Sequence, residues 1–184
     1  ALLTGLAQDR WDLVIASHGI TDERAKAVTF MAPHYCSGGM IVAKDAKIKT
    51  AKDLTGKTVG VQTGTTYLEN VQKLGTAKEV RNFPSDADAR SALAAGRVDA
   101  WVTDRFTAIE SARKNPQLKL NLGDMLFTER IAAAAAKGNT TLANAWNDAG
   151  WRDRAETAQA PRSRPYQHRW HARPARHAAG RGLF

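Results

Sequence analysis

Three polar positions in this sequence have the residue types and surroundings that bind the charged ends of a small zwitterion. The first is Arg24, in the segment ASHGITDERAKAV, just after an apolar stretch. An arginine at such a place can direct two N–H groups to one carboxylate. The alternative is that Arg24 is a solvated charge on a helix.

The second position is the pair Thr65 and Thr66, in the segment VGVQTGTT. A buried strand there leads through a glycine-containing turn into a helix, whose first backbone N–H groups attract anions. Gly64 allows a ligand to approach the backbone closely. The segment lacks the GKT or GKS of a phosphate-binding loop. The alternative is a capped helix without a ligand.

The third position is Asp104, in the segment GRVDAWVTD, at the carboxyl end of an apolar strand. Ligands of open α/β sheets bind at such strand ends, and a carboxylate there can pair with an ammonium group. The alternative is that Asp104 caps a helix that begins near Phe106. An arginine, two amides and an aspartate together match the groups of a free amino acid.

Alternating strands and helices are expected to position these residues. Strands are predicted at 11–16, 39–43, 58–62, 80–83, 98–102, 118–122 and, more weakly, in the alanine-rich segment 129–136. Helices are predicted at 1–8, from Thr21, and at 67–74, 86–95, 106–113 and 140–149. This alternation predicts an α/β fold with a mixed sheet flanked by helices.

The charge of the chain is uneven along its length. The net charge is +9, but residues 151–184 contain eight arginines and two acidic residues. Only a small excess of positive charge therefore belongs to the first 150 residues. The single cysteine, Cys36, excludes an internal disulfide, and the five histidines are too dispersed to indicate a metal site. No apolar run is long enough for a membrane helix, and no signal peptide is recognised.

The segment 151–184 differs in composition from the rest of the chain. It contains no Ile or Val and a single Leu, and it is rich in Arg, Ala, Pro and His. We expect it to be disordered, because it offers little apolar surface to offset the entropy of ordering. Its composition suggests a shifted reading frame of GC-rich DNA.

The same motifs resemble the family 3 extracellular solute-binding proteins, the polar amino-acid group of periplasmic binding proteins. GITDERAKAVTFMAPHYCSGGMIVAK resembles the signature of the family. IKTAKDLTGKTVGVQTGTT is similar to the entry into its second lobe, and ALAAGRVDAWVTD to the ligand-facing strand of that lobe. The resemblance runs in order from about Leu3 to Ala149.

The resemblance implies a role for each matched residue. Arg24 would bind the α-carboxylate of the ligand, and the amide of Thr66, with Thr65 beside it, would complete that site. Asp104 would bind the α-ammonium, and Ser17 would offer its carbonyl to the same group.

Two neighbouring positions depart from the family pattern. Gly19 stands where the family usually has Ser or Thr, so its backbone N–H is kept but a hydroxyl that supplements the ammonium site is missing. His18 stands where an apolar residue is common; it is either an exposed histidine or a contact to the ligand side chain.

The resemblance also implies a division of the chain within a fold of periplasmic-binding-protein type II. Residues 1–37 would be a remnant of lobe one with the first hinge strand, and 38–122 a complete lobe two. Residues 123–150 would form the second hinge strand and the return to lobe one, followed by the basic tail 151–184. The resemblance also implies that the opening of lobe one and the usual C-terminal end are missing, so we expect exposed apolar edges and a homodimer or swapped oligomer.

The expected function is that of the amino-acid-binding component of a bacterial ABC importer, located in the periplasm or outside the cell. Its partners would be a free amino acid and a membrane permease, with no cofactor, metal or nucleic acid. Three alternatives remain: a scaffold that no longer binds, an enzyme resembling cyclohexadienyl or arogenate dehydratases, and a nucleic-acid-binding module based on the tail.

Overall fold

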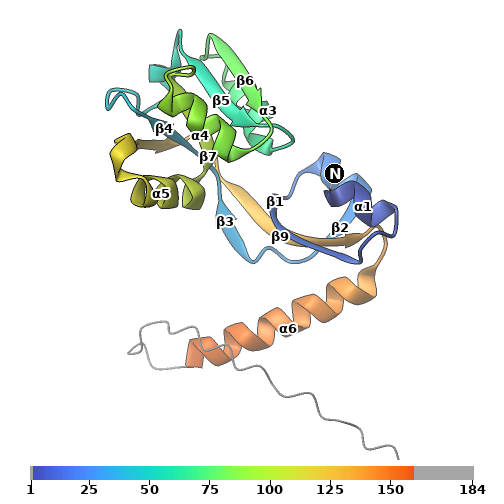
Figure 1. Ribbon diagram of the computed structural model, residues 1–184. Coiled ribbons are helices and arrows are strands. Elements are labelled where there is room, and N and C mark those ends of the chain that lie inside the picture. Colours follow the sequence, from blue (N-terminus) through green and yellow to red (C-terminus); the bar gives the residue numbers. More distant parts are fainter. Residues whose placement is uncertain (1, 160–184) are drawn as a thin grey trace, which may run out of the picture.

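The computed structural model describes residues 2–159, in which the chain forms two bodies, each built around one β-sheet (Figure 1). The larger body comprises residues 39–125, and the smaller body comprises residues 2–37 and 129–149. The long helix α6 (Thr140–Gln159) begins on the smaller body and projects away from it (Figure 1).

The larger body contains a five-stranded sheet of order β6-β5-β7-β4-β8. Strands β5, β6 and β7 are parallel, whereas β4 runs antiparallel to both β7 and β8. The bounds are β4 (Gly39–Ala43), β5 (Thr58–Gln62), β6 (Glu79–Phe83), β7 (Ala100–Asp104) and β8 (Asn121–Met125).

Apolar side chains of this sheet alternate between two buried clusters because successive residues of a strand face opposite sides. Ile41 and Val102 pack on the side covered by helix α3 (Thr66–Leu74) and the 3₁₀ turn η1 (Ala51–Leu54). Val42 and Trp101 pack on the other side, under α4 (Asp86–Ala94) and α5 (Arg105–Lys114). The core of the larger body is therefore filled on both faces.

The smaller body is organised around the eight-residue strand β9 (Glu129–Ala136). Strands β1 (Leu13–Gly19), β2 (Val28–Phe30) and β3 (Tyr35–Ser37) all pair antiparallel with β9. Helix α2 (Asp22–Ala27) connects β1 to β2.

The alanines of β9 lie between two helices. Ala134 packs in the cluster that includes Leu6 of helix α1 (Leu2–Ala7), whereas Ala133 and Ala135 pack with Ala143 of α6. The small side chains leave room for a helix on each face of the strand. This two-sided burial explains why an alanine run, a weak strand former, is a central strand here.

Two chain segments connect the bodies. β3 continues into β4 through Gly38, and β8 leads to β9 through residues 126–128. The segments touch: a β-carbon on Gly38 would overlap the carbonyl oxygen of Phe127, and one on Gly39 would meet the Phe127 ring. The Leu126 N–H donates a 2.7 Å hydrogen bond to the Gly39 carbonyl.

Most predicted elements are confirmed, including the strands at Gly39–Ala43 and Thr58–Gln62 with their predicted bounds. The strand expected at 118–122 instead covers Asn121–Met125, because Pro116–Leu118 forms a 3₁₀ turn that ends at Lys119 with a φ of 49°. The mixed α/β architecture agrees with the expectation.

The expectation of disorder from residue 151 is wrong for its first nine residues, because α6 continues to Gln159. The segment WRDRAETAQ holds no proline or glycine and contains several good helix formers, so the helix continues until shortly before Pro161. Residues 160–184 lie outside the described residues.

The contact between the two connecting segments predicts the effect of Gly38→Ala. The added methyl group overlaps backbone atoms, which cannot move aside as a flexible side chain could, so the variant is expected to lose about 1–3 kcal/mol of folding free energy. Thermal unfolding followed by circular dichroism measures the loss. An unchanged melting temperature would show that the two segments are not packed as described.

Candidate functional site

A cavity of about 230 Å³ lies where the β1–α2 segment of the smaller body meets the β5–α3 turn of the larger body. Five of the six residues predicted to bind the ligand line it, and Asp104 does not. The lining includes Ser17, Gly19, Arg24, Thr65, Thr66 and Glu129.

Arg24 is positioned by the first turn of α2. Thr21 caps this helix, and its hydroxyl oxygen accepts a 3.1 Å hydrogen bond from the Arg24 N–H. The half-buried guanidinium then donates from Nη1 to the Gly19 carbonyl at 3.0 Å and from Nη2 to the Gly64 carbonyl at 3.2 Å. Arg24 thus links the two bodies and keeps three further N–H groups for a ligand.

The start of α3 forms the opposite side of the cavity. Gly64 has a φ of 77°, which an L side chain rarely adopts, and it turns the chain from β5 into the helix. Thr65 is the N-cap residue, and its hydroxyl donates to the Gln62 carbonyl at 2.7 Å. The first backbone N–H groups of a helix have no partner within it, so those of Thr65 and Thr66 can serve an anion here.

Ser17 lies at an irregularity of β1, and Gly19 follows where the regular pairing with β9 has resumed. The pairing of β1 with β9 shifts register between Val14 and His18, and Ser17 within this bulge has a φ of 50°. Its hydroxyl accepts a 2.7 Å hydrogen bond from the Tyr35 hydroxyl. Positive φ in a non-glycine residue is uncommon and often marks a functional position, and here it removes Ser17 from the regular ladder beside the cavity.

Asp104 does not line this cavity, and both of its carboxylate oxygens accept hydrogen bonds from other residues. It caps α5, and its Oδ1 accepts hydrogen bonds from the Phe106 and Thr107 N–H groups at 2.8 and 3.3 Å. Its Oδ2 accepts a hydrogen bond from the Ser37 hydroxyl. Asp104 therefore caps α5 and does not line this cavity, and its contact with a ligand ammonium group stays a prediction.

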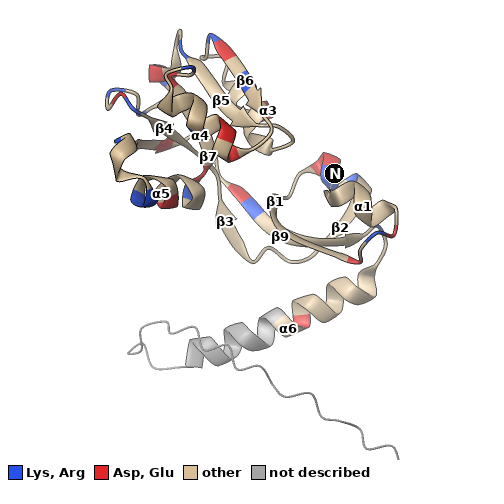
Figure 2. Cartoon of the chain, viewed as in Figure 1, with Lys and Arg blue, Asp and Glu red and all other residues tan. Residues whose placement is uncertain are grey.

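Glu129 is a residue of the cavity that the sequence reasoning missed. It is half-buried at the start of β9, where Figure 2 shows a red and a blue band between the two bodies. Its Oε2 accepts a 2.7 Å hydrogen bond from the Thr66 hydroxyl. The only sequence signal is an acidic residue at the start of an alanine-rich strand, because the position of Glu129 depends on its pairing with Ser37 of β3.

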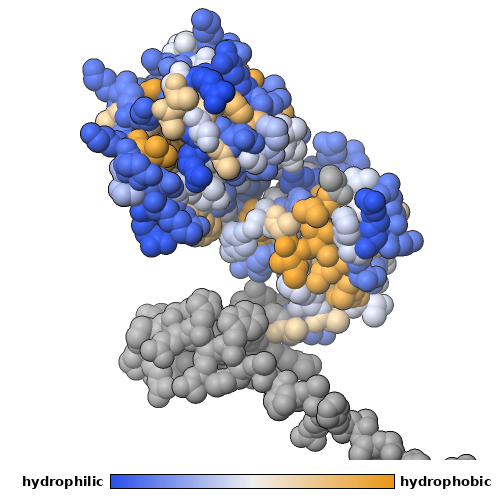
Figure 3. All heavy atoms as spheres, viewed as in Figure 1, coloured by the Kyte–Doolittle hydropathy of each residue, from blue (hydrophilic) through white to orange (hydrophobic). Residues whose placement is uncertain are grey.

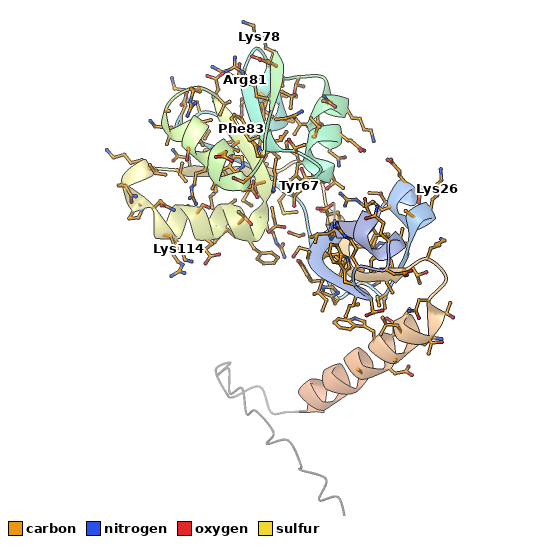
Figure 4. All side chains as sticks on the ribbon, turned by 45° about the vertical axis from the view of Figure 1, so that its right-hand side comes forward. Lys26, Tyr67, Lys78, Arg81, Phe83 and Lys114 are labelled. Atoms are coloured by element: carbon orange, nitrogen blue, oxygen red, sulfur yellow. The ribbon has the colours of Figure 1, made fainter. Side chains whose placement is uncertain are left out.

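Two further groups of the cavity have shifted pKa values. Burial, and then the nearby Arg24 charge, lower the pKa of His18, so this imidazole is neutral at pH 7. Burial, followed by the charges of Glu129 and Asp104, raises the pKa of Tyr67. Tyr67 is labelled in Figure 4 on the side of the larger body that faces the smaller one, and its phenol stays protonated as a donor.

A second cavity of about 460 Å³ lies on the far side of Arg24, between α1, α2 and α3. Arg24, Gly64, Thr65 and Thr66 line both cavities, so the guanidinium stands between them. Within residues 2–159, no cluster of three or more His, Cys, Asp or Glu could hold a metal, and no helix is long and apolar enough to cross a membrane.

Curated relatives share this sequence over most of its length. The chain is 35% identical over 151 residues to the L-cystine-binding protein TcyJ of Escherichia coli K12, covering 80% of this chain and 57% of TcyJ. The chain therefore spans little more than half of that relative.

Solved structures share the fold. An ancestral arginine-binding protein bound to glutamine is 35% identical, with a TM-score of 0.79 over 85% of this chain and 71% of that one. The holo arginine-binding protein of T. maritima is 35% identical, with a TM-score of 0.76 over 87% of this chain and 70% of that one. The type II periplasmic-binding-protein fold is thereby confirmed.

The sequence of residues 1–159 matches the family model of bacterial extracellular solute-binding proteins, family 3. Together with the two-body fold and the cavity between the bodies, this match shows that the chain belongs to the bacterial extracellular solute-binding proteins of family 3.

Proposed function

We propose that this chain binds the α-carboxylate of a free amino acid through Arg24, as the solute-binding component of an ABC importer. The observation that carries the proposal is the guanidinium at the junction of the two bodies, with the first N–H groups of α3 in the same cavity wall. A guanidinium and helix-terminal amides are a strong combination for one carboxylate.

The names of the relatives support an amino-acid ligand and leave its side chain open. They comprise a cystine-binding protein, arginine-binding proteins and an arginine-binding protein bound to glutamine. In this proposal the two bodies are the two lobes, and the segments 37–39 and 125–129 are the hinge. Thr65 and Thr66 complete the carboxylate site, and the Ser17 and Gly19 backbone contacts the ligand from the smaller body.

Partner and location follow from the family. A solute-binding protein works with a membrane permease and is located in the periplasm or outside the cell, and we propose both for this chain. We also propose that the chain is not an enzyme, since the relatives are binding proteins. Neither the comparisons nor the described site favours the dehydratase or the nucleic-acid alternative.

The proposal predicts a selective thermal shift that depends on Arg24. A ligand at 100 times its dissociation constant stabilises the folded state by about 2.7 kcal/mol, so one or a few amino acids should raise the melting temperature of the wild type. Arg24→Ala should abolish this shift. A screen of the common L-amino acids by differential scanning fluorimetry measures it.

Arg113→Ala is the matched control, because Arg113 is an exposed arginine on α5, away from the cavity. It should keep the full ligand-induced shift. The Arg24 variant also loses the hydrogen bonds to Gly19 and Gly64, so the comparison uses the shift caused by the ligand rather than the melting temperature itself. A ligand-induced shift that survives in Arg24→Ala would reject the assignment.

We also propose that two chains associate through β1. Within the described residues β1 pairs only with β9, which leaves its other edge open. Ile15 in the middle of this strand is 60% exposed, and Leu2 of α1 is also exposed. Figure 3 shows an orange patch on the smaller body. Open apolar strand edges pair readily with another chain.

Association through β1 predicts that Ile15→Lys shifts the chain towards the monomer. Light scattering coupled to size-exclusion chromatography should show the wild type as a dimer or larger species whose share rises with concentration. Leu122→Lys is the matched control, an exposed apolar residue on the edge strand β8 of the larger sheet, and it should leave the association intact. A wild type that is monomeric at every concentration would contradict the proposal.

A further inference from the structure

We propose that the Glu129 side chain is a latch that favours the closed arrangement of the two bodies before any ligand binds. Glu129 is the first residue of β9, in the smaller body. Its Oε2 accepts a 2.7 Å hydrogen bond from the Thr66 hydroxyl, and its carboxylate accepts another from the Tyr67 phenol. Thr66 and Tyr67 belong to the larger body, so both hydrogen bonds run from one body to the other.

The smaller body fixes the position of the carboxylate. Glu129 is the Cα partner of Ser37 in the β3–β9 pair, which holds its backbone. The carboxylate lies in the space that a β-carbon of residue 19 would occupy, and Gly19 itself pairs with Ile131 of β9. The Glu129 side chain is therefore packed against β1 and moves with the smaller body.

The larger body fixes the two hydroxyl groups. Thr66 and Tyr67 are the first residues of α3, and each is only 8% exposed. The Tyr67 ring packs in the core of the larger body and against Phe127, with the ring centroids 5.7 Å apart. In Figure 4 Tyr67 lies on the side of the larger body that faces the smaller one. A rotation of one body about the connecting segments therefore changes the separation between these hydroxyls and the carboxylate.

The two hydroxyl groups are the partners on which the Glu129 carboxylate depends. Within residues 2–159 it forms no ion pair within 4.0 Å, and the ion pairs of that part of the chain involve Glu69, Glu79 and Glu110. Hydrogen bonds to a charged acceptor are shorter and stronger than those between neutral groups. Opening of the bodies exchanges both bonds for hydrogen bonds to water, so the net difference favours the closed arrangement.

A corresponding contact lies on the other connecting segment. Ser37, the strand partner of Glu129, donates its hydroxyl to Asp104, which caps α5. The two paired residues thus bind the starts of two different helices of the larger body, α3 and α5. Because the contacts are separate, the one at Glu129 can be removed while the Asp104 cap stays intact.

Under the proposed function, the latch also raises the affinity for the ligand. The apparent dissociation constant of a ligand increases as the fraction of molecules in the binding-competent arrangement falls. A latch that populates the closed arrangement in advance reduces the free energy that the ligand must supply for closure. The latch itself rests only on contacts within the chain, so it can be tested without a ligand.

The test measures the separation of the two bodies in the ligand-free chain by double electron–electron resonance. Spin labels are attached through Lys26→Cys on the smaller body and Lys78→Cys on the larger one, two exposed positions labelled in Figure 4. The exposed Cys36 is first replaced by serine. The intact latch should give one main, short distance between the labels.

Glu129→Gln should weaken the latch while it keeps the size of the side chain. Glutamine offers one neutral acceptor oxygen in place of a carboxylate, so both hydrogen bonds cannot be kept at full strength. We expect the ratio of open to closed molecules to rise at least about fivefold. Glu110→Gln is the matched control, because Glu110 is paired with Lys114 on the exposed surface of α5. It should leave the distances unchanged.

A second set of changes acts from the larger body. Thr66→Val combined with Tyr67→Phe removes the two hydroxyl donors and keeps the shapes of the side chains, so it should open the bodies to a similar extent. In that background Glu129→Gln should add little, because residues in contact are energetically coupled.

Three results would overturn the latch: a ligand-free chain that is fully open, distances that do not change in Glu129→Gln, or additive effects of the changes on the two bodies. A chain that binds no amino acid would instead reject the proposed function. The distances between the spin labels would still decide on the latch.

Discussion

The site depends on one side chain, Arg24, whose guanidinium donates to a carbonyl of each body. Several local features are required to place it: the Thr21 cap at the start of α2, the bulge in β1 and the positive φ of Gly64. All of these features lie close to the same cavity. The fold therefore holds the N–H groups of Arg24 in place between the two bodies. A carboxylate of a bound ligand would be their acceptor.

The second constraint on the site is strand β9, the central strand of the smaller body. It pairs with three other strands, packs helices on both faces through its alanines and begins with Glu129 at the cavity. The tight contact of Gly38 and Gly39 with Phe127 holds the two connecting segments together. A small movement at these segments would change the separation of Arg24 and Thr66, which lie on different bodies. Under the proposed function these segments are the hinge through which the two bodies would close on a ligand.

Local sequence patterns predicted much of the fold and the cationic half of the site. The strand at Thr58–Gln62, the helix start at Thr21 and the turn at Gly64 follow from residues close together in the chain. Glu129 could not be found in this way, because its place in the cavity results from pairing with β3 and from the missing side chain of Gly19. For Asp104 both interpretations were open from sequence, and the capping geometry appears only once α5 is in place.

The most direct test of the account is a crystal structure of the chain grown with the amino acid that stabilises it most. The account predicts that the ligand lies between the two bodies, with its carboxylate on the Arg24 guanidinium and the Thr66 N–H. A ligand bound elsewhere, with Arg24 still donating to the carbonyls of Gly19 and Gly64 alone, would contradict it.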